Sequence, residues 1–487
     1  MAGSVGSASR SATQTQPRVQ VIAPAHLGKT AIDALRARGI EARTATEADV
    51  TDDVVAWALE TTPTASAAIE LAEVCARAAE SGRPVCLLAP PPTRGNSRAA
   101  IERAAGLAYL RAHGAALGHD VDVWLETVVA LVRFGMPSGP RAAIVAPNGS
   151  WLEAQAIALV AEAELLGVRP PVLGKAGKGD DPTDVVLFDP SLAPVPSHLP
   201  GLHIPVVARA ELGDDSAALY GARAALGAIE VLGHAAERIA VGIGPAPKTA
   251  SAELAINKEL LDRQLQKLAP GARVGDHETK TLLHAYGVPI TRQAVATTPS
   301  AAVKAARRAG FPVEIKPWGH NLPTEPEGCP VERNVTSDAL VRRAFSAVLA
   351  AAGRPSTTTE PGAVIVREPP PLGRDLSVSL MKLPALGWTV VVDAPGAAQV
   401  AAAPAPLRLV DAEMLARAMV ASRASDPDPD RSGLANLLRR TSHFAADLDR
   451  NIVKLELPRV VVGGRGSRTV VADAWSELAG AMPFPGR

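Results

Sequence analysis

Residues 274–316 read VGDHETKTLLHAYGVPITRQAVATTPSAAVKAARRAGFPVEIK, and this segment is the most informative about the C-terminal part of the chain. The pattern predicts a helix over residues 278–285, after which YGVP leads into a short strand. A second helix is predicted over residues 301–309, followed by GFPVEIK, a strand that ends on Lys316. The stretch therefore predicts two helix–strand pairs, with a lysine at the end of the second strand.

Toward the N-terminus, short apolar runs that suit buried parallel strands alternate with helical segments. This alternation predicts two α/β units with parallel sheets, over residues 18–137 and 138–240. Gly, Pro and small residues over 241–252 indicate a linker, and an α+β domain with antiparallel strands is expected over 253–487. Residues 1–17 are rich in Ser, Gly, Thr and Gln, which predicts a disordered tail.

The composition excludes several classes of function. The chain has 487 residues, of which 47% are hydrophobic and 21% charged, so it can build several packed domains. Lys+Arg and Asp+Glu both total 50, and the zero net charge argues against a nucleic-acid or membrane-surface partner. No uncharged apolar run reaches the roughly 18 residues that a transmembrane helix needs.

Three cysteines, Cys75, Cys86 and Cys329, fit neither a zinc site nor a disulfide framework. Cys75 and Cys86 lie in apolar helix and strand contexts, which favours a role in the core. Free thiols are typical of a reducing compartment, so a cytoplasmic location is expected.

Six short motifs carry a resemblance to a known family. In chain order they are ALRARGIEA (34–42), RPVCLL (83–88), YGVP (286–289), GFPVEIK (310–316), AVIVRE (363–368) and VVADA (470–474). In this order they resemble the NDP-forming acyl-CoA synthetases, the relatives of acetate–CoA ligase and succinyl-CoA synthetase. The resemblance implies two flavodoxin-like, succinyl-CoA synthetase-like parallel-sheet domains followed by an ATP-grasp-like α+β domain. It also implies an ATP-dependent ligase that joins an acid to CoA while ATP becomes ADP and phosphate.

The resemblance assigns roles to individual residues. His113, in the segment AHGAALGH, matches the histidine that carries a phosphoryl group in the family. Lys316 matches a lysine that contacts the nucleotide phosphates, and Glu368 and Asp375 stand near acidic positions beside the nucleotide. Gly28 precedes a helix predicted from residue 30 and would meet an anion at the start of that helix.

Each of these residues also has a structural interpretation. A lone histidine such as His113 is more often structural than catalytic. Lys316 could bind nucleotide, or it could pair with Glu314 or Glu325. The turn before Gly28 lacks the serines of the family's phosphate-binding turn, so it could be an ordinary strand-to-helix connection.

Several family positions carry residues that do not suit the family's chemistry. Glu325 stands where a phosphate-facing lysine is expected, and at about 4 Å in an effective dielectric near 20 this exchange costs several kcal/mol per charge pair. Val453 and Leu457 replace the metal ligands, so no metal site is predicted and Mg²⁺ is disfavoured. No G-x-G-x-x-G motif, and no room for a CoA-binding Rossmann domain, precedes Val19, which disfavours CoA. ATP remains a candidate ligand.

Two functions are compatible with this pattern, and a regulator that binds nucleotide without turnover lies between them. The first is a non-catalytic scaffold or regulatory relative of the ligases. The second is an active NDP-forming acid–CoA ligase that works through phospho-His113 with a separate CoA-binding subunit. Either suits a homo-oligomer or a hetero-oligomer with an acyl-CoA synthetase-type subunit. We favour the first, because three charge-handling positions are lost and only Lys316 and His113 are retained.

Overall fold

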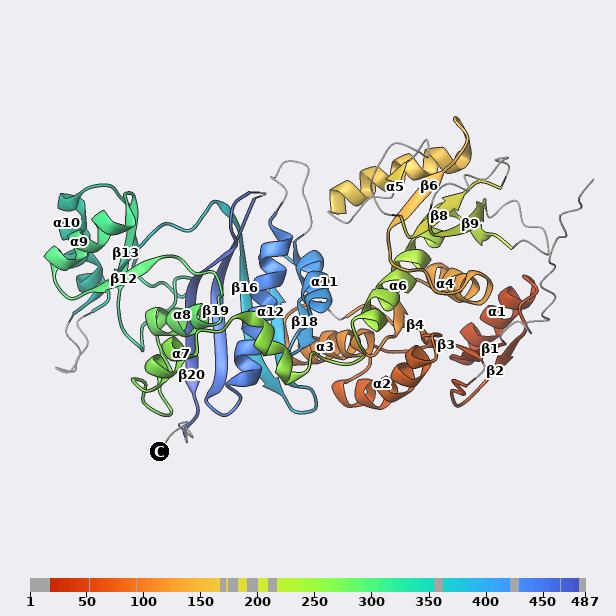
Figure 1. The fold of residues 1–487 in the computed structure, drawn as a ribbon, viewed down its shortest axis with the longest axis horizontal. Coiled ribbons are helices and arrows are strands. Elements are labelled where there is room, and N and C mark those ends of the chain that lie inside the picture. Colours follow the sequence, from red (N-terminus) through yellow and green to blue (C-terminus); the bar gives the residue numbers. More distant parts are fainter. Residues whose placement is uncertain are drawn as a thin grey trace, which may run out of the picture.

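The structure, a computed structural model, describes residues 18–480 with nine short exceptions. The exceptions are residues 52, 93, 167–171, 174–182, 191–199, 209–216, 354–361, 421–428 and 465. The tail predicted for residues 1–17 lies outside the described residues. The described residues form four sheets, which Figure 1 shows arranged along an elongated molecule. In this described part, every helix is too short or too polar to cross a membrane.

The first sheet is parallel and five-stranded, in the order β2-β1-β3-β4-β5. Its strands are β1 (Val19–Ile22), β2 (Ala42–Thr44), β3 (Val54–Ala58), β4 (Cys86–Leu88) and β5 (Ala116–Gly118). The helices that accompany them are α1 (Ala25–Arg36), α2 (Ala65–Glu80), α3 (Arg98–Ala112) and α4 (Val121–Phe134). The side chains of Thr64, Ser97 and Asp120 accept hydrogen bonds from the first turns of α2, α3 and α4, which sets where these helices begin.

The second sheet repeats this arrangement, in the order β10-β9-β8-β6-β7 with every pairing parallel. Its elements are β6 (Ala142–Val145), α5 (Trp151–Leu166), β7 (Val172–Leu173), β8 (Val185–Phe188), β9 (Leu202–Val207), β10 (Leu219–Tyr220) and α6 (Ala222–Ala240). In both sheets the second strand lies at one edge beside the first, which is a common order for doubly wound α/β sheets. The α/β fold with parallel sheets that the alternation predicted is therefore confirmed.

The two parallel sheets share one apolar core. Helix α4 packs against α6, and a single hydrophobic cluster joins Val19 and Val21 of β1 to Ile204 and Val206 of β9. Cys86 of β4 belongs to this cluster, and Cys75 of α2 to a second cluster on the other side of the first sheet. Both thiols are buried as predicted, and burial raises the pKa of each to about 12.

The C-terminal part contains two antiparallel sheets, ordered β11-β20-β19-β16-β17-β18 and β12-β15-β13-β14. The larger sheet consists of β11 (Arg273–Val274), β16 (Gly373–Leu383), β17 (Gly387–Asp393), β18 (Ala401–Pro404), β19 (Ile452–Gly463) and β20 (Val470–Leu478). The smaller sheet consists of β12 (Gln293–Ala296), β13 (Val313–Pro317), β14 (Glu332–Val335) and β15 (Val364–Arg367). The antiparallel strands expected in this part are therefore present.

Helices cover both of these sheets. They are α7 (Lys258–Leu265), α8 (Asp276–Ala285), α9 (Pro299–Ala309), α10 (Asp338–Ala351), α11 (Leu409–Met419) and α12 (Arg431–Asp447), and a 3-10 helix, η2 (Lys248–Leu254), precedes them. The two helices predicted within residues 274–316 are present as α8 and α9. Helix α9 begins two residues earlier than predicted because the side chain of Thr298 caps its first turn.

Helix α3 joins the first α/β unit to the C-terminal part (Figure 1). Ile101, Ala104 and Ala105 on α3 pack against Val391 of β17 and Ala402 of β18. The two parts of the molecule therefore meet through a buried apolar contact.

Candidate functional site

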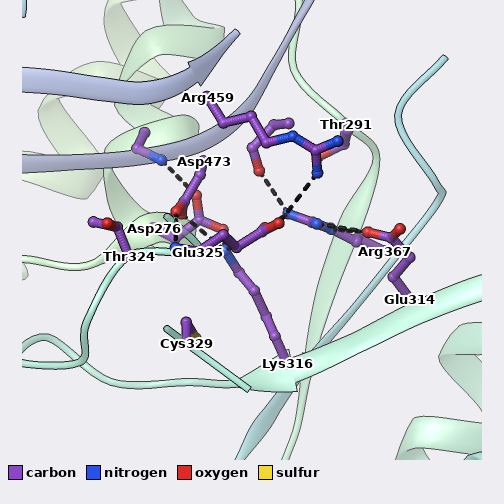
Figure 2. A network of polar contacts seen from close by, with 12 residues as sticks. Asp276, Thr291, Glu314, Lys316, Thr324, Glu325, Cys329, Arg367, Arg459 and Asp473 are labelled. Atoms are coloured by element: carbon purple, nitrogen blue, oxygen red, sulfur yellow. Dashed lines mark hydrogen bonds and ion pairs between the residues drawn. The ribbon is translucent and has the colours of Figure 1, made fainter. Parts of the chain in front are cut away.

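Lys316 lies at the centre of a buried group of charged side chains (Figure 2). It is carried by β13, all of whose residues are buried, and its own side chain is only 3% exposed. Its Nζ lies 2.9 Å from Oδ2 of Asp276, 2.9 Å from Oδ1 of Asp473 and 3.5 Å from Oε1 of Glu325. The lysine that the resemblance assigns to phosphate is therefore surrounded by three carboxylates of the chain itself.

Arg367, at the end of β15, is a second buried cation in this group. Strands β13 and β15 pair with Glu314 opposite Arg367, and the Nη2 atom of Arg367 lies 2.5 Å from Oε2 of Glu314. The Nη1 atom of Arg367 lies 2.6 Å from Oε1 of Glu325. The register of the two strands thus directs Glu314, one of the expected partners of Lys316, to Arg367 instead.

Glu325 connects four cations. Its Oε1 atom contacts Lys316 and Arg367. Its Oε2 atom lies 3.2 Å from Nη1 of Arg459 on β19 and 3.2 Å from Nη2 of the more exposed Arg333. The Oδ2 atom of Asp473 accepts a hydrogen bond from the backbone N–H of Glu325 at 2.7 Å, which fixes the loop that carries this residue. The residue that replaces a phosphate-facing lysine therefore supplies negative charge between four cations.

Lys280, in α8, is buried on the other side of Asp276. Its Nζ lies 3.1 Å from Oδ2 of Asp276 and donates a hydrogen bond to the carbonyl oxygen of Ala472 at 2.6 Å. Burial lowers the pKa of Lys280 to about 8, although the charge of Asp276 opposes this shift. Asp276, the first residue of α8, thus holds Lys280 and Lys316 together.

These contacts leave the group electrically balanced. Its less exposed members are four carboxylates and four cations, which we call the charge cluster: Asp276, Glu314, Glu325, Asp473, Lys280, Lys316, Arg367 and Arg459. At its exposed rim Arg333 adds one cation, paired with Glu314 and Glu325, and Asp375 adds one anion, paired with Arg459. Burial alone would raise the pKa of Glu325, but the charges of Arg367 and Lys316 lower it to about 2. Burial lowers the pKa of Lys316, but Asp276 and Asp473 outweigh it and raise that pKa above its ordinary value. Each cation already has an anionic partner before any ligand binds.

Glu368 and Asp375, the acidic residues expected beside a nucleotide, lie in different surroundings. Glu368 follows β15 and is held at 2.6 Å by the guanidinium groups of both Arg292 and Arg468. Burial raises the pKa of Glu368, but its hydrogen bonds to Arg292 and the charges of both arginines produce a net lowering. Asp375 is exposed on β16 and pairs with Arg459 at 3.3 Å. Of the two, Asp375 touches the charge cluster, at its rim.

His113 follows the last residue of α3. Its Nδ1 lies 2.7 Å from the carbonyl oxygen of Tyr109, and because a carbonyl only accepts, Nδ1 carries a proton; in the neutral ring Nε2 is therefore the unprotonated nitrogen. Its ring also packs on that of Tyr109, with the centroids 4.1 Å apart, and burial lowers the pKa of His113. The charged groups that act on it are Arg238 and Asp411, which are outside the charge cluster.

Gly28 lies inside α1 rather than before it. The helix begins at Ala25, five residues earlier than the predicted start at residue 30. The N–H of Gly28 donates to the carbonyl oxygen of Pro24 at 2.8 Å. This amide therefore belongs to the first turn of hydrogen bonds in α1 and is not free to meet an anion.

The resemblance also implies a magnesium ion with the nucleotide, and the residues present do not fit one. Val453 is half-exposed on β19, and Leu457 is fully buried in the hydrophobic core of the larger sheet. The neighbouring Glu456 is bound to Ser379 and Lys454. Every carboxylate of the charge cluster faces a cation. Within the part of the chain that the structure describes, no cluster of three or more His, Cys, Asp or Glu side chains is arranged to hold a metal.

Sequence reasoning did not single out five members of the charge cluster: Asp276, Lys280, Arg367, Arg459 and Asp473. A signal was present for Arg367, which ends an apolar strand, and for Asp473, which interrupts one, because such residues are rarely buried unless they are paired. Arg459 carries no comparable signal, because charged and apolar residues alternate along that part of β19.

The part of the chain that carries the charge cluster matches a known protein family. A family model described as an ATP-grasp domain matches residues 269–477, a range that includes the whole charge cluster. Residues 269–477 are therefore an ATP-grasp domain.

This part of the chain is homologous to the β subunits of ADP-forming acetate–CoA ligases. Subunit β of acetate–CoA ligase II from Pyrococcus furiosus is 23% identical over 215 residues, which are 42% of this chain and 91% of that subunit. The ADP-forming 4-hydroxybutyrate–CoA ligase of Nitrosopumilus maritimus is 26% identical over 135 residues, 28% of this chain and 19% of that ligase. The resemblance drawn from the six motifs is thus confirmed for the C-terminal part.

A solved structure aligns with a similar share of the chain. It is the dinucleotide-forming acetyl-coenzyme A synthetase 1 of Ca. Korarchaeum cryptofilum in complex with coenzyme A, Ca-AMPCP and HgCl+. It is 24% identical, with a TM-score of 0.40, and the alignment covers 46% of this chain and 99% of that one.

Proposed function

We propose that this chain is a non-catalytic relative of the ADP-forming acyl-CoA ligases, with a scaffold or regulatory role. The observation that supports this is the burial of Lys316 against the carboxylates of Asp276, Asp473 and Glu325. Phosphoryl transfer depends on cations and metal ions that stabilise charge on the phosphate oxygens. Here a nucleotide phosphate would have to displace carboxylates that already neutralise those cations.

The direct test is turnover. With ATP, Mg²⁺, CoA and a panel of short acids, we expect the lone chain to release no ADP or phosphate above background, because the charge cluster has no spare positive charge. Release would be followed by a coupled ADP assay and a phosphate assay, with Lys316→Ala as the control variant. Robust release by the wild type that disappears in Lys316→Ala would show that the proposal is wrong.

A second function, an active ligase working through phospho-His113, is favoured by one observation. The unprotonated Nε2 of His113 has the state that a nucleophilic imidazole needs. The residues on either side, Ala112 and Gly114, lack the hydroxyls that would help to hold a phosphate. After incubation with radiolabelled ATP and Mg²⁺ we therefore expect no acid-labile, base-stable phosphate on the isolated protein. Label that appears in the wild type and is lost in His113→Ala would place the active ligase first.

The same proposal extends to domain organisation and partners. We infer that residues 18–137 and 138–240 are two flavodoxin-like domains, because their strand orders agree with that fold. Two relatives of the ATP-grasp domain are named as β subunits, which supports a hetero-oligomer with an acyl-CoA synthetase-type subunit. A partner that carries a CoA-binding domain would complete the set of domains that the family resemblance implies.

A further inference from the structure

Helices α9 and α10 cover the smaller antiparallel sheet at one end of the elongated molecule (Figure 1). Their apolar sides belong to one hydrophobic cluster with the strands beneath them. The opposite sides of both helices face solvent and carry several cations. These are Lys304, Arg307 and Arg308 on α9 and Arg342 and Arg343 on α10, which we call the basic patch.

The two helices lie side by side in opposite directions, which brings these cations onto one surface. Near the start of α9, Nη1 of Arg342 donates a hydrogen bond to Oγ of Ser300 at 3.4 Å. Near the end of α9, Nε of Arg307 donates to Oδ1 of Asp338, the first residue of α10, at 3.2 Å. Ser300, Lys304 and Arg307 follow one another at the spacing of a helical turn, so Lys304 lies between these two contacts. The basic patch is therefore continuous across both helices.

The basic patch has an excess of positive charge. Among the described residues, its ion pairing is limited to the contact between Arg307 and Asp338. The hydrogen bond from Arg307 lowers the pKa of Asp338, and the charges of Arg307 and Arg342 act in the same direction. Five cations and one carboxylate leave four positive charges in excess, on a chain whose net charge is zero.

Helix stability explains only part of this charge. The negative end of the helix dipole favours cations in the last turn, and Arg307 and Arg308 lie in the last turn of α9. Arg342 and Arg343 lie in the second turn of α10, where the dipole gives a cation no advantage. Lys304 and Arg308 are four residues apart, and like charges at this spacing destabilise a helix. Three of the five cations therefore lack a stabilising role in their own helices.

Apolar side chains border the basic patch. Leu340, three residues before Arg343 on α10, is 41% exposed, and Phe311, two residues after the end of α9, is 39% exposed. Four of the five cations are arginines, and an arginine binds a carboxylate through two parallel hydrogen bonds. Arginines beside apolar side chains are typical of surfaces that bind other proteins.

These features favour an acidic protein over other anionic partners. Asp338 lies within the basic patch and would repel the phosphates of a nucleic acid, whose backbone also offers no apolar group to Leu340 and Phe311. Because Leu340 and Phe311 are less than half exposed, they do not protrude as the side chains that enter a membrane do. A protein segment with carboxylates and apolar side chains matches both the cations and their apolar border.

We propose that the basic patch is a docking surface for an acidic segment of another protein. Its carboxylates would pair with Arg308, Arg342 and Arg343, and its apolar side chains would contact Leu340 and Phe311. The basic patch shares no residue with the charge cluster. The proposal therefore does not depend on whether the ATP-grasp domain turns over ATP.

The test is fluorescence anisotropy with the full chain and a labelled peptide in which the sequence Glu-Glu-Leu is repeated four times. We expect saturable binding that weakens at least tenfold between about 20 and 200 mM salt, because salt screens exposed charges. A peptide with lysine in place of glutamate should not bind. No binding of the acidic peptide at low salt would refute the proposal. Tighter binding of single-stranded DNA of equal charge, or of vesicles that contain phosphatidylserine, would overturn the class of partner.

Charge reversal tests whether the peptide binds at the basic patch. Arg308→Glu combined with Arg343→Glu should weaken binding at least tenfold, because two attractive pairs become repulsive. The matched control combines Lys258→Glu with Arg263→Glu at exposed positions of α7, which lowers the net charge equally and should change Kd less than twofold. Equal losses of affinity in the two double variants would show that the peptide responds to net charge alone, against the proposal.

Leu340→Ser keeps every charge of the basic patch and removes part of its apolar border. This variant should weaken the acidic peptide about threefold, because less apolar surface is buried on binding. The salt dependence should stay as in the wild type, because the same ion pairs form. A wild-type Kd both in Leu340→Ser and in the Arg308→Glu, Arg343→Glu variant would place the peptide elsewhere on the molecule and overturn the proposal.

Discussion

Arg367→Met is expected to lower the free energy of unfolding of the ATP-grasp domain by about 3–5 kcal/mol. The side chain of Arg367 is fully buried and lies between Glu314 and Glu325. Its removal would leave two carboxylates close together in a region from which water is largely excluded. Urea unfolding at pH 7 would give the loss of stability, and hydrogen exchange along β13 and β15 would locate it.

Arg333→Met is the matched control. Arg333 approaches the same two carboxylates, at 3.6 Å from Glu314 and 3.2 Å from Glu325, but its side chain is 55% exposed. Exposed ion pairs contribute about 0–1 kcal/mol, so this variant should lose less than about 1 kcal/mol. Equal losses of stability in Arg333→Met and Arg367→Met would mean that burial does not determine how much an ion pair of the charge cluster contributes to the free energy of unfolding.

Glu325→Gln is expected to lower the free energy of unfolding by about 3 kcal/mol at pH 7. The difference in this free energy between the variant and the wild type should disappear in acid. Folding lowers the pKa of Glu325 from 4.5 to about 2. A carboxyl group of this kind stabilises the folded state fully above its unfolded pKa and loses that effect as the pH falls through its folded pKa. The wild type should therefore lose this stabilisation between about pH 4.5 and pH 2. The variant should lack this dependence of the free energy of unfolding on pH.

Urea unfolding of both proteins at a series of pH values from 7 to 3 measures this slope. Glu332→Gln is the control, because Glu332 is exposed on the neighbouring β14 and its loss should leave the slope intact. A wild-type–variant difference that stays constant from pH 7 to pH 3 would contradict the pairing of Glu325 with Arg367 and Lys316.

The two variants also bear on the proposed function. In a site that binds ATP, the cations would be free to pair with the phosphate oxygens. A carboxylate between these cations would weaken nucleotide binding. If Glu325 instead stabilises the folded protein, its carboxylate serves as the permanent counter-charge of these cations, and a nucleotide phosphate is not needed to neutralise them. The expected loss of stability in Glu325→Gln would support a structural role for the Glu325 carboxylate in place of a nucleotide-binding role for this group of residues.

Sequence patterns alone determined much of the fold. The alternation of apolar strands and helices predicted two parallel-sheet units, because the periods of helices and strands are local properties. The four C-terminal motifs, at residues 286–289, 310–316, 363–368 and 470–474, predicted the ATP-grasp relationship. Strand β3 (Val54–Ala58) was not predicted, although VVAWA is a short apolar run of the same kind as the other buried parallel strands. The predicted start of α1 was also too late, so Gly28 was placed before the helix rather than within it.

The pairing of charges around Lys316 depends on tertiary contacts that the sequence does not reveal. The members of the charge cluster come from positions between Asp276 and Asp473, and they meet through the register of β13 with β15 and the packing of α8 on β20. Sequence could offer Glu325 as a partner for Lys316 but could not exclude Glu314. The reason is physical: the strength of an ion pair depends on distance and on loss of water, and both are set by strands and helices that are distant in sequence.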